Sequence, residues 1–222
     1  MFKSWTRTIV YTQYEHGRLA GTLARHWGNE AFARPALDFH TFAAGVMLHD
    51  WGYGVVDNLP IGEAPEDEWL DVIRNGVENR FKHPTTDIVV KLHLRRLLSM
   101  HSSPEREALI AQIDARIDGR LDESGALLET FQRADKITQL CDMISFSYCF
   151  ESPVELTYPV FSRSDAAETT SFTFEVRPGG EVTVDPWPFS VLFISGIMYA
   201  FDRQDYPEKL NPLAVPFKIQ RR

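Results

Sequence analysis

The stretch Gly45-Val-Met-Leu-His49-Asp50-Trp-Gly-Tyr-Gly54 says most about the fold of this chain and about its site. Its first residues continue an apolar run with helical spacing, so it predicts the end of a helix, and the glycines after Asp50 predict a loop. Adjacent imidazole and carboxylate side chains can offer nitrogen and oxygen ligands to one divalent metal ion. A His-Asp pair also occurs by chance, so it indicates a metal site only where further ligands lie elsewhere in the chain.

The segments on both sides of this stretch have helical patterns. Apolar residues recur at helical spacing from Thr12 to Trp27, and Asp38 is a suitable N-cap for a helix that runs to Leu48. The Gly- and Pro-rich segment from Trp51 to Pro65 predicts a loop. Further helices are predicted over residues 65 or 66 to about 79, 86–100, 104–117 and 127–150.

The pattern changes after Pro153. Phe172-Thr-Phe-Glu-Val and Glu181-Val-Thr-Val alternate in polarity and predict a two-stranded hairpin that turns within Arg177-Pro-Gly-Gly180. The tail to Arg222 predicts a short strand or helix and extended pieces. We therefore expect a mainly α protein, with a helical bundle at residues 1–152 and a small β-hairpin and extended appendage at residues 153–222 packed on it.

Composition limits the classes of function. The chain has 222 residues, of which 44% are hydrophobic and 24% charged, as in ordinary globular proteins. A formal net charge of −8 argues against a nucleic-acid partner. The sequence contains neither an apolar run of the roughly 20 residues that a membrane span needs nor the apolar core of a signal peptide. We expect a cytoplasmic protein that binds a small molecule, not a nucleic acid or a membrane; a homo-oligomer is possible.

Potential metal ligands lie on separate predicted helices. His16 falls on the first helix and His101 follows a later one, while His93, eight positions before His101, is an alternative to it. Asp135 and Asp142 are two helical turns apart and share a face, and the apolar surroundings of Asp142 require that a buried carboxylate find a partner. Such imidazoles and carboxylates suit one or two ions of iron, manganese or zinc. The expected ligands are His16, His49, Asp50 and His101, with Asp142 or Asp135 as the last.

The order of these residues resembles the HD-domain superfamily, helical metal-dependent phosphohydrolases with some oxygenase relatives. More narrowly, the sequence is similar to the DUF3891 family of uncharacterised bacterial proteins, and the similarity covers most of the chain. The segments that carry it are Gln13-Tyr-Glu-His16 through Gly28, His49-Asp50 through Pro60, Leu97-Leu-Ser-Met-His101, Gln139-Leu-Cys-Asp142 through Cys149, and Pro186-Trp-Pro-Phe189.

The resemblance implies an HD-like helical fold and four metal ligands, His16, His49, Asp50 and Asp142. It makes His101 a further ligand or a base that faces the substrate. The general superfamily pattern would also accept Asp135 as the last ligand. Dinuclear members carry two extra histidines, for which this chain offers His101 and the weaker candidates His83 and His93, so one ion is favoured over two.

The resemblance and the ligand chemistry predict a hydrolase that acts on a small phosphorylated or nucleotide-like molecule through metal-activated water. Asp50 would orient the ion and the water, while Asp57 or Glu15 would accept the proton. Arg18 or Lys136 would neutralise phosphate charge. Two alternatives remain open at this point: a di-iron oxygenase that acts on a small organic substrate, and a non-catalytic scaffold or binding protein.

Overall fold

The computed structural model describes residues 1–153, 155–163, 166–177 and 179–222. Its α-helices lie near the predicted segments, but one continues past Ile117 to Ser124, the one predicted to run to residue 100 ends at Leu98, and a short 3-10 helix lies in the segment predicted as a loop. None of the helices formed by the described residues has both the length and the apolar content needed to cross a membrane. The helices are α1 (Gln13–His26), α2 (Phe39–Met47), the short 3-10 helix η1 (Tyr53–Val56), α3 (Glu66–Glu78), α4 (Pro84–Leu98), α5 (Pro104–Ser124) and α6 (Leu128–Phe150).

Two N-caps fix where the helices that lead to the His-Asp pair begin. The Thr12 hydroxyl accepts a hydrogen bond from the Glu15 backbone N–H at the start of α1, at 3.3 Å. The predicted cap Asp38 accepts one from the Thr41 N–H at the start of α2, at 2.9 Å. Such caps satisfy backbone donors that the first helical turn leaves unpaired. Because α2 ends at Met47, the His-Asp pair lies in the turn that follows it.

The expectation of a mainly α protein with a small hairpin is wrong. The protein is a mixed α and β structure, 45% helical and 22% strand, with a curled seven-stranded sheet in the described residues. The order in the sheet is β1-β2-β6-β7-β5-β4-β3, antiparallel except between β5 and β7. The strands are β1 (Phe2–Lys3), β2 (Ile9–Tyr11), β3 (Glu155–Phe161), β4 (Thr169–Arg177), β5 (Glu181–Asp185), β6 (Phe193–Asp202) and β7 (Leu213–Arg221).

The predicted hairpin is present as β4 and β5, but it forms only part of this sheet. Gly179 and Gly180 have φ angles of 90° and 83°, a conformation that glycine adopts without strain, while the turn residue Pro178 lies outside the described residues. The sheet continues through β7 and β6 to β1 and β2 at the start of the chain. Sequence patterns are local, and they did not reveal pairing between the two ends of the chain.

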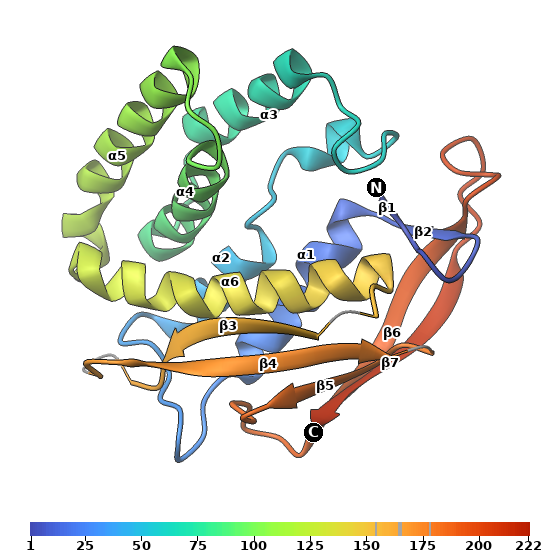
Figure 1. The fold of residues 1–222 in the computed structure, drawn as a ribbon. Coiled ribbons are helices and arrows are strands. Elements are labelled where there is room, and N and C mark those ends of the chain that lie inside the picture. Colours follow the sequence, from blue (N-terminus) through green and yellow to red (C-terminus); the bar gives the residue numbers. More distant parts are fainter. Residues whose placement is uncertain (154, 164–165, 178) are drawn as a thin grey trace.

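The helices lie on one side of the sheet, with α6 running across it beneath α3, α4 and α5 (Figure 1). Tyr148 of α6 packs on Phe217 of β7, with ring centroids 6.1 Å apart. Helix α1 packs against α6 and α2 and also contacts β6, while α2 packs against α4. The helices α1, α2, α4 and α6 therefore meet at one place in the interior, and this is where the His-Asp pair lies.

Candidate metal centre

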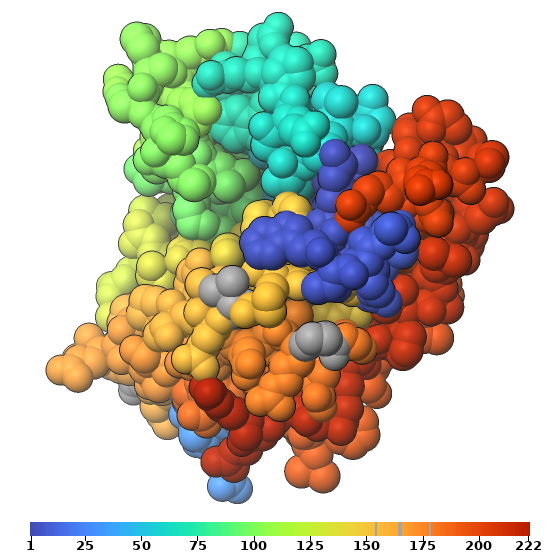
Figure 2. Space-filling view, turned by 45° about the vertical axis from the view of Figure 1, so that its right-hand side comes forward, coloured from blue at the N-terminus to red at the C-terminus, as the bar shows by residue number. Residues whose placement is uncertain are grey.

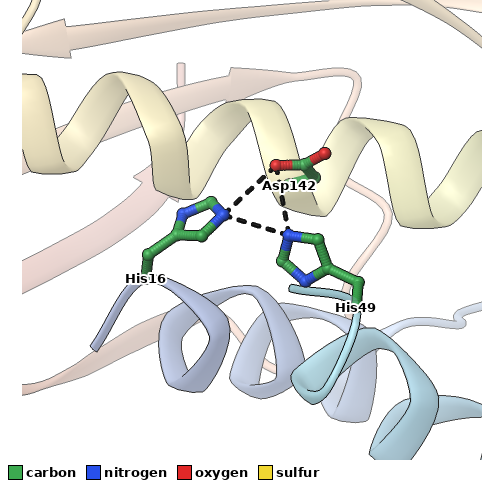
Figure 3. A group of neighbouring side chains, drawn as sticks. All are labelled: His16, His49 and Asp142. Atoms are coloured by element: carbon green, nitrogen blue, oxygen red, sulfur yellow. Dashed lines mark hydrogen bonds and ion pairs between the residues drawn. The ribbon is translucent and has the colours of Figure 1, made fainter. Parts of the chain in front are cut away.

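Histidine and aspartate side chains from four helical regions meet in the interior. We refer to His16, His49, Asp50 and Asp142 as the His/Asp centre. Figure 3 shows His16, His49 and Asp142 with their polar atoms facing one another. His16 and His49 are completely buried, and the two carboxylates are largely so. His16 comes from α1, His49 and Asp50 from the turn after α2, His93 from α4, and Asp142 from α6.

The facing atoms of His16, His49 and Asp142 have the spacing of ligands around one ion. The Nε2 atoms of His16 and His49 are 3.0 Å apart, and each is 3.3 Å from Oδ1 of Asp142. Oδ2 of Asp50 lies 3.3 Å from His16 Nε2 and 3.5 Å from His49 Nε2. Atoms at about 2.1 Å from a common ion lie about 3.0 Å apart in an octahedral arrangement and about 3.4 Å apart in a tetrahedral one. The donor set therefore fits a divalent transition metal.

The backbone fixes which nitrogen of His49 carries the proton. Nδ1 of His49 lies 2.7 Å from the carbonyl oxygen of Val46, which can only accept, so Nδ1 donates. In the neutral imidazole this leaves the lone pair of Nε2 directed at the centre. The ring of His16 packs against Phe2 at 4.9 Å, and its Nδ1 has no hydrogen-bond partner among the described residues. Both rings thus turn Nε2 toward the same point.

In each carboxylate, one oxygen accepts a hydrogen bond from outside the His/Asp centre, and the other oxygen faces the centre. Oδ1 of Asp50 accepts a hydrogen bond from His93 Nε2 at 2.9 Å, which leaves Oδ2 facing the two imidazoles. Oδ2 of Asp142 accepts from Arg96 at 3.4 Å, which leaves Oδ1 facing them. Outer hydrogen bonds of this kind orient ligands in metal sites.

Arg96 organises the outer side of the centre. Its guanidinium donates two hydrogen bonds to Asp135, at 2.7 and 2.9 Å, and one to Nδ1 of His93, at 2.7 Å. Because arginine only donates, Nδ1 of His93 accepts, and the proton of this neutral ring is on Nε2, where it donates to Asp50. Asp135 therefore anchors Arg96 and does not face the centre, whereas His93 positions Asp50.

The charges of the centre favour a cation. Burial raises the pKa of the Asp50 carboxyl, but His49 and His16 lower it more, and the net pKa lies far below its usual range. Burial likewise raises the pKa of Asp142, while His49 and His16 bring it well below its usual value. Burial lowers the pKa of His16, yet hydrogen bonds to Asp142 and Asp50 raise it well above 6.5. Two buried carboxylates thus stay ionised and draw positive charge to the imidazoles.

Two further residues that the sequence nominated lie outside the His/Asp centre. His101 is exposed in the bend after α4, because this helix ends at Leu98 and does not carry His101 back to the interior. Asp57 accepts hydrogen bonds from the backbone N–H of Gln13, at 2.9 and 3.1 Å, and pairs with the amino group of Met1 at 2.9 Å. Asp57 is therefore engaged at the start of α1.

The other proposed helpers of catalysis are also engaged elsewhere. Glu15 pairs with Arg18 and accepts the backbone N–H of Tyr199 at 2.7 Å, and Arg18 also donates to the carbonyl of Ile197. Sequence reasoning gave His93 less weight than His101 and missed Arg96. The signal for His93 was its position inside an apolar helical run, where a histidine has to be buried. Arg96, three positions further on the same helix, had no signal of its own in the sequence.

These observations define a mixed α and β protein whose helices enclose a buried cluster of two histidines and two aspartates. The chain belongs to the DUF3891 family, described as proteins of unknown function, whose family model matches residues 3–195. The matched range includes every residue of the His/Asp centre and extends into β6. No curated protein and no solved structure matches the chain.

Proposed function

We propose that the His/Asp centre binds one divalent transition metal ion, iron, manganese or zinc, and that the protein hydrolyses a phosphate ester of a small molecule. The order of the ligands supports a place for the helical part in the HD-domain superfamily. A histidine on the first helix, the His-Asp pair after the second and an aspartate on the last helix of the bundle are the elements of that resemblance.

The observation that carries this proposal is the convergence of three potential ligand atoms, from His16, His49 and Asp142, without a protein donor between them. His16 Nε2 and His49 Nε2 face each other and both face Asp142 Oδ1, with separations of 3.0 to 3.3 Å. With His49 protonated on Nδ1, its Nε2 is an acceptor. Facing acceptors in a buried site are unfavourable unless a proton or a metal ion lies between them.

A single ion is better supported than a pair. A second potential group, formed by His49, Asp50 and His93, shares His49 with the group of His16, His49 and Asp142. His93 is held by Arg96 in the form that donates from Nε2, so that nitrogen has no free lone pair. Within the described part of the chain, the ligands for two irons are therefore incomplete, and hydrolysis with one ion is favoured over dioxygen chemistry.

A divalent ion, when bound, would lower the pKa of a water ligand and polarise a phosphoryl oxygen. The residues of the chain hold and orient this chemistry. His49 presents Nε2 because Val46 fixes its tautomer, and Asp50 presents Oδ2 because His93 holds Oδ1. Enclosure by four helices keeps bulk water out, which strengthens the electrostatic interactions of the site.

Elemental analysis tests metal binding directly. The protein is purified without chelators and dialysed against metal-free buffer, and we expect about one equivalent of iron, manganese or zinc per chain. His49→Ala should lose the metal and keep its far-UV circular dichroism spectrum. His101→Ala is the matched control, since it removes an imidazole outside the centre and should retain the metal. Metal-free wild-type protein that also fails to bind added Mn²⁺, Fe²⁺ or Zn²⁺ would refute the proposal.

A substrate panel tests the reaction. The metal-loaded protein is incubated with phosphomonoesters and phosphodiesters of nucleosides and of sugars, and released phosphate or alcohol is measured. Hydrolysis should disappear in His49→Ala and with chelator, and should proceed without oxygen. Consumption of dioxygen with two irons per chain would instead favour the oxygenase.

A further inference from the structure

A cavity of about 410 Å³ lies beside the His/Asp centre, between the start of α1 and the segment from Tyr53 to Trp69. Figure 2 shows the first residues of the chain, in dark blue, next to the teal region that carries this segment. The backbone N–H of Ile61 donates to the carbonyl of Met1 at 3.0 Å, which joins the two regions. The volume is that of a small-molecule site. Its walls include Gln13, Tyr53, Val56, Leu59, Ile61 and Trp69.

We call this cavity the ring cavity. Gln13 and one turn of the chain bring it close to the His/Asp centre. Gln13 also lines a second cavity of about 220 Å³, and Asp50 is one of the residues that line it. The turn that follows Asp50 lines both spaces: Gly52 and Gly54 border the second cavity, and Tyr53 borders the first. Gln13 therefore borders both cavities, and the second of them reaches Asp50.

The ring cavity contains an unused hydrogen-bond acceptor and an unused donor. The side-chain oxygen Oε1 of Gln13 has no partner within the described residues, although the residue is only 6% exposed. The Tyr53 hydroxyl accepts a hydrogen bond from Trp69 Nε1 at 2.7 Å, which leaves its own proton available. Burial raises the pKa of the Tyr53 hydroxyl, so it keeps this proton. A buried unpaired amide oxygen is costly, and in native proteins it usually has a ligand or water as its partner.

We propose that the ring cavity binds a planar heteroaromatic ring of the nucleobase type. The Gln13 oxygen would accept an N–H from the ring, and the Tyr53 hydroxyl would donate to a ring nitrogen or carbonyl. Apolar and aromatic residues make up much of the remaining wall, which suits the faces of such a ring, and Glu66, His101 and Arg106 add charged or polar groups to it. The inference rests on the proposed function, since it assigns the phosphate ester at the centre to a nucleotide-like molecule.

Calorimetric titration of the full chain with adenosine, guanosine, cytidine and uridine tests the inference, with ribose as the comparison probe. At least one nucleoside should bind and ribose should not. Gln13→Met, which keeps the side-chain length and removes the acceptor, should weaken binding at least tenfold. Tyr53→Phe, which removes only the hydroxyl, should also weaken it. Trp5→Ser is the control, because Trp5 is an exposed indole outside the cavity, and it should bind as the wild type does.

The inference is overturned if no nucleoside binds, or if both cavity variants bind as tightly as the control. Titration of His49→Ala separates this outcome from the proposed function, since nucleosides lack the phosphate and should still bind to the variant without metal. Nucleoside binding by a protein that takes up no metal would reject the proposed hydrolysis and keep the ring cavity. Metal-dependent hydrolysis of sugar phosphates without nucleoside binding would keep the proposed hydrolysis and reject the ring cavity as a site for a nucleobase.

Discussion

Two buried clusters of charged residues involve α4, and they differ in how their charges are paired. The Asp87 cluster consists of Asp87, Lys91 and Arg120. Lys91 donates to Asp87 Oδ1 at 2.9 Å and to the carbonyl of Asn79 at 2.8 Å, and Arg120 Nε lies 3.3 Å from Asp87 Oδ2. Arg120 also donates to the carbonyl of Phe81 at 2.8 Å. Arg120 pairs with Glu123 as well, so each charged group of this cluster has a partner of opposite charge, and carbonyl oxygens accept further hydrogen bonds.

The His/Asp centre lacks this internal balance. Its four inward atoms are imidazole nitrogens and carboxylate oxygens, and the cation Arg96 reaches only the outer oxygen of Asp142. Buried charge is tolerated when it is paired and hydrogen-bonded, as in the Asp87 cluster. A buried group of facing acceptors is unfavourable unless a proton or a metal ion lies between them. The comparison therefore sets a structural ionic cluster against the proposed metal site, and the same substitution in both tests it.

The largest effect on folding is expected from Asp87→Asn. The change leaves Lys91 and Arg120 buried without their carboxylate, and breaking a buried ion pair typically costs about 3–5 kcal/mol. Urea unfolding should show a loss of this size, while the metal content per folded chain stays at the wild-type value. A metal content that falls together with stability would show that the two clusters are not independent.

Asp142→Asn is the matched substitution in the centre. It should weaken metal binding by at least about 100-fold, because residues that only orient a metal ligand already contribute about 10–100-fold. In the metal-free protein, Asp142→Asn should change the free energy of unfolding less than Asp87→Asn does, because it removes one of two neighbouring carboxylates and leaves the other. Competition with a fluorescent chelator measures the affinity. An unchanged affinity would exclude Asp142 as a ligand.

A smaller effect is expected from Arg96→Gln. The variant loses the donor that fixes the tautomer of His93, so His93 no longer holds Asp50 in one orientation, and metal affinity should fall about 10–100-fold. Arg95→Gln is the control, because the neighbouring Arg95 pairs with Asp114 on the surface. Equal effects of both changes would mean that Arg96 has no particular role at the centre.

The smallest expected effect concerns the pH dependence of stability. The stability of the metal-free protein and the additional stabilisation by metal should change in opposite directions as pH rises. The pKa values of His16 and His49 are raised above 6.5 in the folded chain, because Asp142 and Asp50 outweigh the effect of burial. Their contribution to the stability of the metal-free protein is complete below about pH 6.5 and is lost as pH rises through the raised values. Metal binding needs deprotonated imidazoles and strengthens over the same range.

Thermal unfolding between about pH 6 and about pH 9 checks this prediction. The Tm of the metal-free protein should fall with increasing pH, and the additional stabilisation by metal should grow. Asp142→Asn should flatten the metal-free curve because it removes one source of the raised pKa values. A metal-free Tm that rises across this range would contradict the expected sign of the histidine contribution.

The helices could be predicted because their signals are local. Apolar residues at helical spacing and the cap Asp38 gave the bounds of α1 and α2, and with them the positions of His16 and of the His-Asp pair. Asp142 could be distinguished from Asp135 by its apolar neighbours, and the structure places Asp142, but not Asp135, at the centre.

The position of His93 and the pairing of the sheet could not be predicted from local patterns. A one-dimensional pattern puts His93 and His101 on one helix face, but α4 ends at Leu98, so only His93 reaches the interior. Strand β6 pairs with β2 on one side and β7 on the other, and its exposed residues Phe193 and Ile197 break the simple alternation of polarity. No local pattern reveals pairing with a three-residue strand at the other end of the chain.

The pairing of β2 with β6 has a consequence for the order of events during synthesis. Glu15, beside His16, accepts the backbone N–H of Tyr199, which lies 184 positions away. All four residues of the His/Asp centre are made before β6, the strand that secures the first helix. Contacts so distant in sequence form slowly, because a long loop has to close first. On the proposed function, a nascent chain should therefore reach full affinity for metal only after β6 has been made.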